Sequence, residues 1–185
     1  LGVSAQFSAE GGTGILKKKS DNTGINYIER YADDLGHRDF DIICVPSTVN
    51  DAEPYANGVL DAGVDTLYSL IRQYHPTALI LVVGSCGSVN MPSGAAEAIA
   101  TEAATLARFE SKNDPLLITV PAMTAITPPV FGSGNVDGMT GDGNADNCVQ
   151  GGIHYGVYGH MYHAIYMADK TISAIKNRIR ELTLV

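Results

Sequence analysis

Residues 78–83 read ALILVV and form the longest apolar run of the chain. Successive apolar residues of this kind are typical of a strand that helices cover on both faces, and the run is far too short to cross a bilayer. Similar extended runs occupy residues 41–45 and 116–120, and a stretch with helical periodicity separates each run from the next. The alternation predicts an α/β fold, a three-layer, doubly wound parallel sheet.

The helical stretches are identified by apolar residues three and four positions apart. Residues 60–74 carry one apolar stripe, formed by Leu60, Val64, Leu67, Ile71 and Tyr74. A second helix follows Ser93, which suits an N-cap, and carries Ile99, Ala103 and Leu106. The last helix places on one face Ile165, Ala168, Ile172, Ile175, Ile179 and Leu182. A weaker helix spans residues 25–35, and residues 127–152 are predicted to form an excursion loop rich in glycine.

Composition limits the classes of partner. A chain of 185 residues with 45% apolar and 17% charged residues is expected to form one domain over residues 1–185. The net charge of −8 opposes binding to nucleic acid, and the only basic run, Lys17 to Lys19, is interpreted as a solvated loop. No segment has the length of a membrane span, so no membrane partner is expected. The cysteines lack the spacing of thiolate metal sites, and Cys44 and Cys86 are interpreted as buried thiols.

Candidate functional residues follow the strands, because ligands of a doubly wound sheet collect at the carboxyl ends of its strands. The sequence EGGTG occupies residues 10–14, TVND follows a strand at residues 48–51, and His154 precedes the last helix. Their chemistry suits acyl transfer: the Gly12 N–H and the Asn50 amide would stabilise an oxyanion, and His154 would act as general base. Each feature also has an ordinary explanation, since glycines form turns, Asn-Asp caps helices and a single histidine is often structural.

In their order, these stretches resemble the SGNH (GDSL-type) hydrolases over nearly the whole chain. Residues 8–14 look like the second sequence block of that family, residues 48–51 look like the third, and residues 151–154, followed by Gly159 and His160, look like the fifth. The resemblance implies a flavodoxin-like fold and a serine esterase or O-deacetylase that acts on an ester, for instance on a carbohydrate. It assigns the oxyanion role to Gly12 and Asn50 and the base role to His154, with no cofactor and no metal.

The chain departs from the family pattern at several positions. Thr48 stands in place of the third-block glycine, Gly151 in place of the triad aspartate, and Tyr155 in place of a proline that often follows the histidine. A carboxylate from the excursion loop would then orient His154, and the candidates there are Asp137, Asp142 and Asp146. A main-chain carbonyl is the alternative.

The nucleophile block of the family has no clear counterpart. Ser4, in Gly2-Val3-Ser4, is a weak candidate. The preferred interpretation is that the domain is N-terminally incomplete, with the first strand and its serine upstream of Leu1. In the family order 2-1-3-4-5 that strand lies inside the sheet, so a preceding segment or a cleaved partner chain is expected to complete it.

Three alternatives stay open. His154, His160 and His163 could be taken for a metal cluster, although no further ligand sits at a matching spacing. Residues 83–87, VGSCG, resemble a nucleophile elbow whose serine is displaced by one position, which a turn explains better. The whole domain could also be a catalytically degenerate binding or structural module, for example in a phage tail or a cell-surface assembly. The resemblance is closest to phage-associated and secreted members, which favours an extracellular or virion-associated location.

Overall fold

The structure, a computed structural model, describes residues 4–19, 24–84, 95–125, 149–150, 154–155 and 157–183. Its centre is a parallel three-stranded sheet in the order β1-β2-β3, with β1 at Ile42–Pro46, β2 at Leu79–Val83 and β3 at Leu117–Val120. Ile42 is in register with Leu79, and Ile80 is in register with Leu117. The predicted parallel sheet is therefore confirmed, and each strand begins one residue later than its apolar run.

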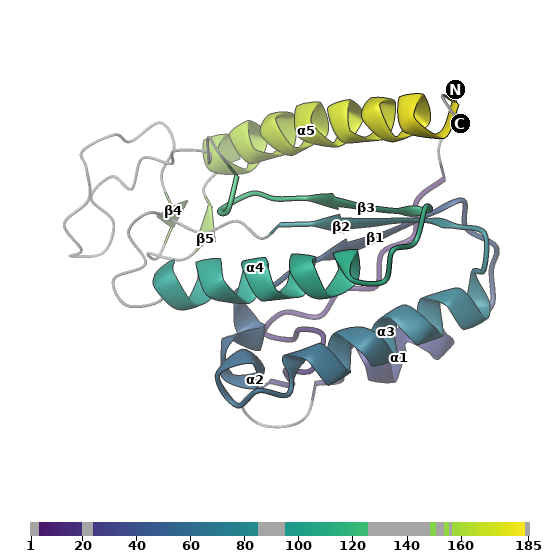
Figure 1. Ribbon diagram of the computed structural model, residues 1–185. Coiled ribbons are helices and arrows are strands. Elements are labelled where there is room, and N and C mark those ends of the chain that lie inside the picture. Colours follow the sequence, from purple (N-terminus) through teal and green to yellow (C-terminus); the bar gives the residue numbers. More distant parts are fainter. Residues whose placement is uncertain are drawn as a thin grey trace.

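Helices cover the sheet on both sides. The helices are α1 at Tyr27–Asp34, α2 at Ala52–Ala56, α3 at Leu60–Tyr74, α4 at Ala95–Glu110 and α5 at Val157–Thr183, with a 3-10 turn, η1, at Val49–Asp51. Helices α1, α3 and α4 lie on one side, and α5 lies on the other (Figure 1). A short antiparallel pair, β4 at Val149–Gln150 and β5 at His154–Tyr155, lies beyond the carboxyl ends of the strands (Figure 1). The chain is thus an α/β protein.

The larger core lies between the sheet and α1, α3 and α4. The alternate strand residues Ile43, Val45, Ile80 and Val82 point into it and are at most 5% exposed. The α3 stripe meets them as predicted, because Leu60, Val64, Leu67 and Ile71 are all buried. Burying each side chain of this size is favourable by about 1.5–3 kcal/mol, so this half of the fold accounts for most of the apolar burial.

The other side of the sheet is only partly covered. Helix α5 packs over β3 and β2 through a smaller cluster that contains Leu81, Ile118 and Met167. The apolar face predicted for α5 is mostly exposed: Ile165, Ile172 and Ile179 keep 69%, 52% and 56% of their surface. Helix formation is confirmed, and the spacing that marked an apolar face did not specify which neighbour would cover it.

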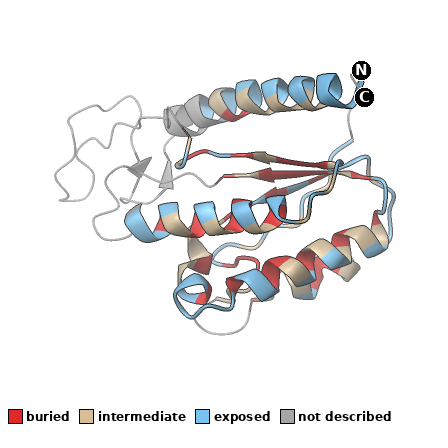
Figure 2. Ribbon diagram, viewed as in Figure 1, coloured by how far each residue is buried: buried red, intermediate tan, exposed pale blue. Residues whose placement is uncertain are grey.

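Strand β1 shows the same one-sided burial (Figure 2). Ile43 and Val45 are buried, whereas Ile42, Cys44 and Pro46, which point to the α5 side, are exposed. The prediction that Cys44 is a buried thiol is therefore wrong, because no described segment lies over this edge of the sheet. Cys86 lies outside the described residues.

Candidate functional site

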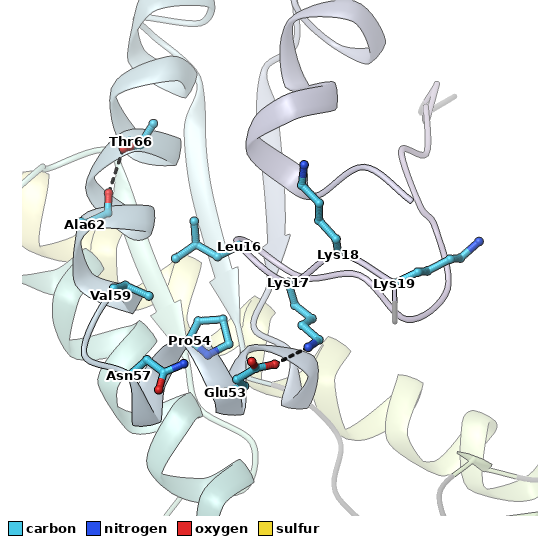
Figure 3. A pocket seen from close by; sticks show the side chains of 10 residues that line it. All are labelled: Leu16, Lys17, Lys18, Lys19, Glu53, Pro54, Asn57, Val59, Ala62 and Thr66. Atoms are coloured by element: carbon cyan, nitrogen blue, oxygen red, sulfur yellow. Dashed lines mark hydrogen bonds and ion pairs between the residues drawn. The ribbon is translucent and has the colours of Figure 1, made fainter. Parts of the chain in front are cut away.

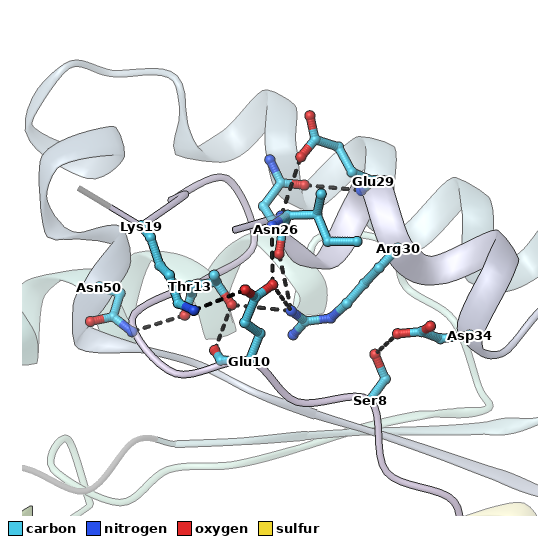
Figure 4. Close-up of polar contacts among 10 residues, drawn as sticks. Ser8, Glu10, Thr13, Lys19, Asn26, Glu29, Arg30, Asp34 and Asn50 are labelled. Atoms are coloured by element: carbon cyan, nitrogen blue, oxygen red, sulfur yellow. Dashed lines mark hydrogen bonds and ion pairs between the residues drawn. The ribbon is translucent and has the colours of Figure 1, made fainter. Parts of the chain in front are cut away.

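The structure brings the glycine turn and Asn50 together, although 37 residues separate Thr13 from Asn50. Asn50 lies in η1, the turn that directly follows β1. Its side-chain Nδ2 donates a hydrogen bond of 2.8 Å to the carbonyl oxygen of Thr13, the residue after Gly12 (Figure 4). The two residues proposed from sequence for an oxyanion site thus belong to one local unit at the carboxyl end of β1.

Gly12 has a backbone conformation that favours glycine. Its φ is +78°, in the left-handed region, within a turn that the Thr13 hydroxyl closes by donating to the Glu10 carbonyl at 2.8 Å. Among the described residues, no acceptor takes the Gly12 N–H. The Gly12 N–H lies one residue before the carbonyl to which the Asn50 amide bonds, and an uncommitted N–H is the kind of donor that an oxyanion requires.

Thr48 explains how η1 is held. Its hydroxyl accepts a hydrogen bond of 3.0 Å from the Asn50 N–H, which is an N-cap contact that glycine cannot make. Thr48, which stands where the resemblance to SGNH hydrolases would place glycine, therefore has a structural role.

Asp51 anchors the loop that carries the glycine turn. Its side chain is 1% exposed, and its two oxygens accept three backbone N–H bonds, from Ile15 at 2.7 Å and from Leu16 and Lys17 at 3.0 Å each. Gly14 passes so close that an added Cβ would lie 2.4 Å from Asp51 Oδ2. The sequence analysis treated Asp51 only as part of a turn. The one sequence signal for an anchoring residue was the glycine-rich stretch at residues 10–14, which needs a partner to hold it in place.

A second set of contacts holds the turn from the α1 side (Figure 4). Arg30 is 4% exposed and donates to the Thr13 hydroxyl at 3.2 Å and to the Ile25 carbonyl at 3.1 Å. Glu10 pairs with Lys19 at 3.1 Å and accepts from the Ile25 N–H, and the hydrogen bond from Lys19 lowers the pKa of Glu10. The turn is therefore fixed on two sides before any ligand binds, as electrostatic preorganisation demands.

His154 lies at the same end of the sheet in a different segment. It is in β5, where it is in register with Gln150 of β4, beyond the carboxyl ends of the central strands (Figure 1). The direction of its side chain lies outside the described part of the structure. So do Gly151, the side chains of His160 and His163, and the loop that contains Asp137, Asp142 and Asp146.

Ser4 is not brought to this place. Gln6 and Ser8 bond to Asp34 at the end of α1, whereas Glu10 bonds to Ile25 before its start, so this segment runs along α1 toward Gly12. Ser4 lies further back along an extended stretch, where each residue adds about 3.3 Å. The structure leaves it exposed and far from Asn50.

The three lysines at residues 17–19 are half-buried and paired, which the interpretation as a solvated loop did not anticipate. Lys17 pairs with Glu53, Lys18 with Glu29, and Lys19 with Glu10. They border an open cleft of about 540 Å³ beside α2 and the start of α3 (Figure 3). Because each ammonium group has a carboxylate partner, the cleft has no surplus positive charge.

A second buried carboxylate fixes the end of β3. Glu102 of α4 is 1% exposed and accepts from the N–H groups of Ala122, Met123 and Thr124 at 2.9–3.2 Å. Gly84, which follows β2, packs closely against this segment: an added Cβ would lie 2.4 Å from the Ala122 nitrogen. The glycine of the elbow-like stretch thus has a packing role, and residues 85–87 lie outside the described residues.

A groove of about 260 Å³ runs along the free edge of β1. Residues 8–11 form one side of it, Cys44 and Pro46 the other, and Tyr31 lines it from α1. The Tyr31 ring packs against Tyr74 and His75, and its hydroxyl is buried without a hydrogen-bond partner among the described residues. Burial raises the pKa of Tyr31. The groove is therefore a space between residues 8–11 and the edge of β1.

Comparisons of the chain with protein-family models, with curated proteins and with solved structures give no match. Within the described residues, no helix has the length and hydrophobicity of a membrane span, and no three histidine, cysteine or acidic side chains gather as a metal site would require.

Proposed function

We propose that this chain forms most of an SGNH-type serine esterase or O-deacetylase with a flavodoxin-like sheet. The observation that carries the proposal is the 2.8 Å bond from Asn50 Nδ2 to the carbonyl of Thr13, the residue after Gly12. One side-chain N–H of Asn50 is used in that bond, and its second N–H is left to pair with the Gly12 N–H around an oxyanion.

The reaction would follow the serine-hydrolase scheme. A serine oxygen attacks the ester carbonyl while His154 takes the hydroxyl proton, and the carbonyl oxygen gains its charge between Gly12 and Asn50. Collapse of the tetrahedral intermediate expels the alcohol, to which His154 returns the proton. Water then repeats the sequence on the acyl-enzyme and releases the acid.

The serine is proposed to come from a strand that occupies the groove beside β1. In the β1–β2 ladder the Leu79 N–H bonds to the Asp41 carbonyl, and the Ser47 N–H bonds to the Val83 carbonyl. Because bonding alternates along a parallel strand, the backbone groups of Ile42 and Cys44 face the opposite, unpaired edge. A parallel strand bonded there would end beside η1, so a residue at its carboxyl end would lie next to Asn50.

The substrate class is inferred to be a small polar ester, such as an acetylated sugar. The support is the glycine, asparagine and aspartate content of residues 132–147, which precede His154 in the sequence. Such residues offer hydrogen bonds and little apolar surface for a long acyl chain.

Hydrolysis of p-nitrophenyl acetate by the protein, together with every polypeptide that stays bound to it, tests the proposal. We expect His154→Ala to abolish turnover, and Asn50→Ala to lower kcat by about 10²–10³-fold, as loss of one oxyanion donor does elsewhere. The control is His37→Ala, which removes an exposed histidine just before β1, at its amino end. Equal rates for His154→Ala and His37→Ala would exclude the esterase and favour the binding module.

A further inference from the structure

Thr13 connects three segments of the chain through its own polar groups (Figure 4). The residue is 3% exposed, and its hydroxyl donates to the Glu10 carbonyl at 2.8 Å while it accepts from Arg30 Nη1 at 3.2 Å. Its carbonyl oxygen accepts the 2.8 Å bond from Asn50 Nδ2. One buried hydroxyl and one carbonyl therefore link the glycine turn to α1 on one side and to η1 on the other.

Arg30 is a buried cation without a short ion pair. Its side chain is 5% exposed, and Nη1 donates to the Thr13 hydroxyl and, at 3.1 Å, to the Ile25 carbonyl. Oε2 of Glu10 lies 3.9 Å from Nη1, and the other oxygen of Glu10 pairs with Lys19 at 3.1 Å. Taking a guanidinium group out of water without a close carboxylate is costly. Stability alone is therefore a poor reason for a cation at this position.

The helix that carries Arg30 is itself fixed to the loop of the glycine turn. Asn26 begins α1 with a capping box, and its Nδ2 donates to the Leu16 carbonyl at 3.1 Å. The N–H of Tyr27, the first residue of α1, donates to the Gly14 carbonyl at 2.9 Å. These bonds hold the first turn of α1 against the loop, so the guanidinium group of Arg30 has a defined place beside the glycine turn.

We infer that Arg30 is a positioning residue for the oxyanion donors. Through the Thr13 hydroxyl it fixes the turn that presents the Gly12 N–H, and the carbonyl of the same residue holds the Asn50 amide. The effect on catalysis rests on the proposed function, whereas the ordering of the turn and of Asn50 does not. A guanidinium group suits this place because it cannot lose its proton in a protein, and its charge favours an anion at the turn.

Substitutions at Thr13 separate positioning from stability in the protein with every polypeptide that stays bound to it. Thr13→Val removes the hydroxyl and keeps the carbonyl, whereas Thr13→Ser keeps both. We expect Thr13→Val and Arg30→Met each to lower kcat for p-nitrophenyl acetate by about 10–100-fold with KM nearly unchanged, because displaced donors act on the transition state. Thr13→Ser should stay within about threefold of wild type. Arg38→Met, which removes an exposed arginine, should match the wild type.

A double variant shows whether Arg30 acts through Thr13. Because Arg30→Met and Thr13→Val remove the same hydrogen bond, the double variant should lose no more kcat than Arg30→Met alone. A folded Thr13→Val protein with the wild-type kcat would overturn the inference. Two losses that multiply in the double variant would overturn it as well, since the residues would then act independently.

Hydrogen exchange of the Asn50 side-chain amide, measured by NMR, is a readout that needs no activity. Thr13→Val and Arg30→Met should each speed this exchange at least about tenfold, with the amide of Asn57, which is exposed, as the reference. Unchanged exchange in a protein that hydrolyses the ester would refute the role of Arg30 and leave the esterase intact. Faster exchange in variants of a protein that hydrolyses no ester would sink the esterase and leave the positioning of Asn50 by Arg30 in place.

Discussion

Asp51 offers the sharpest test of how the glycine turn is held. Asp51→Ala removes the acceptor of three backbone N–H bonds in a site that is 1% exposed. Each buried donor left without a partner costs about 1–3 kcal/mol, and water entering the space recovers part of the sum. We therefore expect the free energy of unfolding to fall by about 3–5 kcal/mol, which corresponds to a Tm lower by roughly 6–20 °C for a chain of this size.

The assay is urea unfolding followed by circular dichroism, with Asp33→Asn as control because Asp33 is exposed on α1. Asp51→Asn should fall between the two, since it keeps one acceptor oxygen and turns an amide donor toward backbone N–H groups. A midpoint for Asp51→Ala equal to that of Asp33→Asn would show that the loop does not depend on the carboxylate, and the preorganised oxyanion site would lose its structural basis.

Two further predictions concern the ends of the central strands. Gly84→Ala should destabilise the fold by about 1–3 kcal/mol, as overpacking does, because its Cβ would meet the Ala122 nitrogen at 2.4 Å; Gly11→Ala, where nothing lies within 4 Å, is the control in thermal unfolding. Asp114 makes the stability of the fold depend on pH. Burial acts to raise the pKa of Asp114, but the 2.7 Å bond from Arg72 and the bonds from Leu116 and Tyr68 outweigh it. They hold the pKa below its usual range. Because the folded pKa is lowered, the stability is present above about pH 4, the unfolded value, and is lost as pH falls through the folded pKa. Asp114→Asn should therefore flatten the acid side of a plot of unfolding free energy against pH below about pH 4; an unchanged slope would contradict the Arg72 contact.

The sequence predicts the sheet well because its signals are local. The successive apolar residues of 78–83 and the stripe from Leu60 to Ile71 each specify burial by spacing alone, and the structure confirms both. The same reasoning failed for Cys44 and for most of the α5 face. An apolar residue indicates that its burial is favourable, but it does not indicate which segment covers it. No described segment covers Cys44 or most of the α5 face.

The candidate site was only partly accessible from sequence for a related reason. Glycine and asparagine at strand ends are visible in the sequence, and their meeting is a consequence of the order of the elements. The carboxylates that hold the site are not visible in this way. Asp51 and Glu102 are charged residues whose burial depends on backbone N–H groups from segments about 35 and 20 residues away, and no periodicity reports such contacts.

Asn50 and Asp51 are consecutive residues whose side chains make different contacts. Asn50 bonds to the Gly12–Thr13 turn, and Asp51 bonds to the loop that follows this turn. Their spacing from β1 is therefore as constrained as their identities. Removing a single residue from the short link at Ser47 and Thr48 would place Asp51 at the position of the amide and Ala52 at the position of the carboxylate. The length of that link, rather than any one side chain within it, is the dimension that a redesign of this site would have to keep fixed.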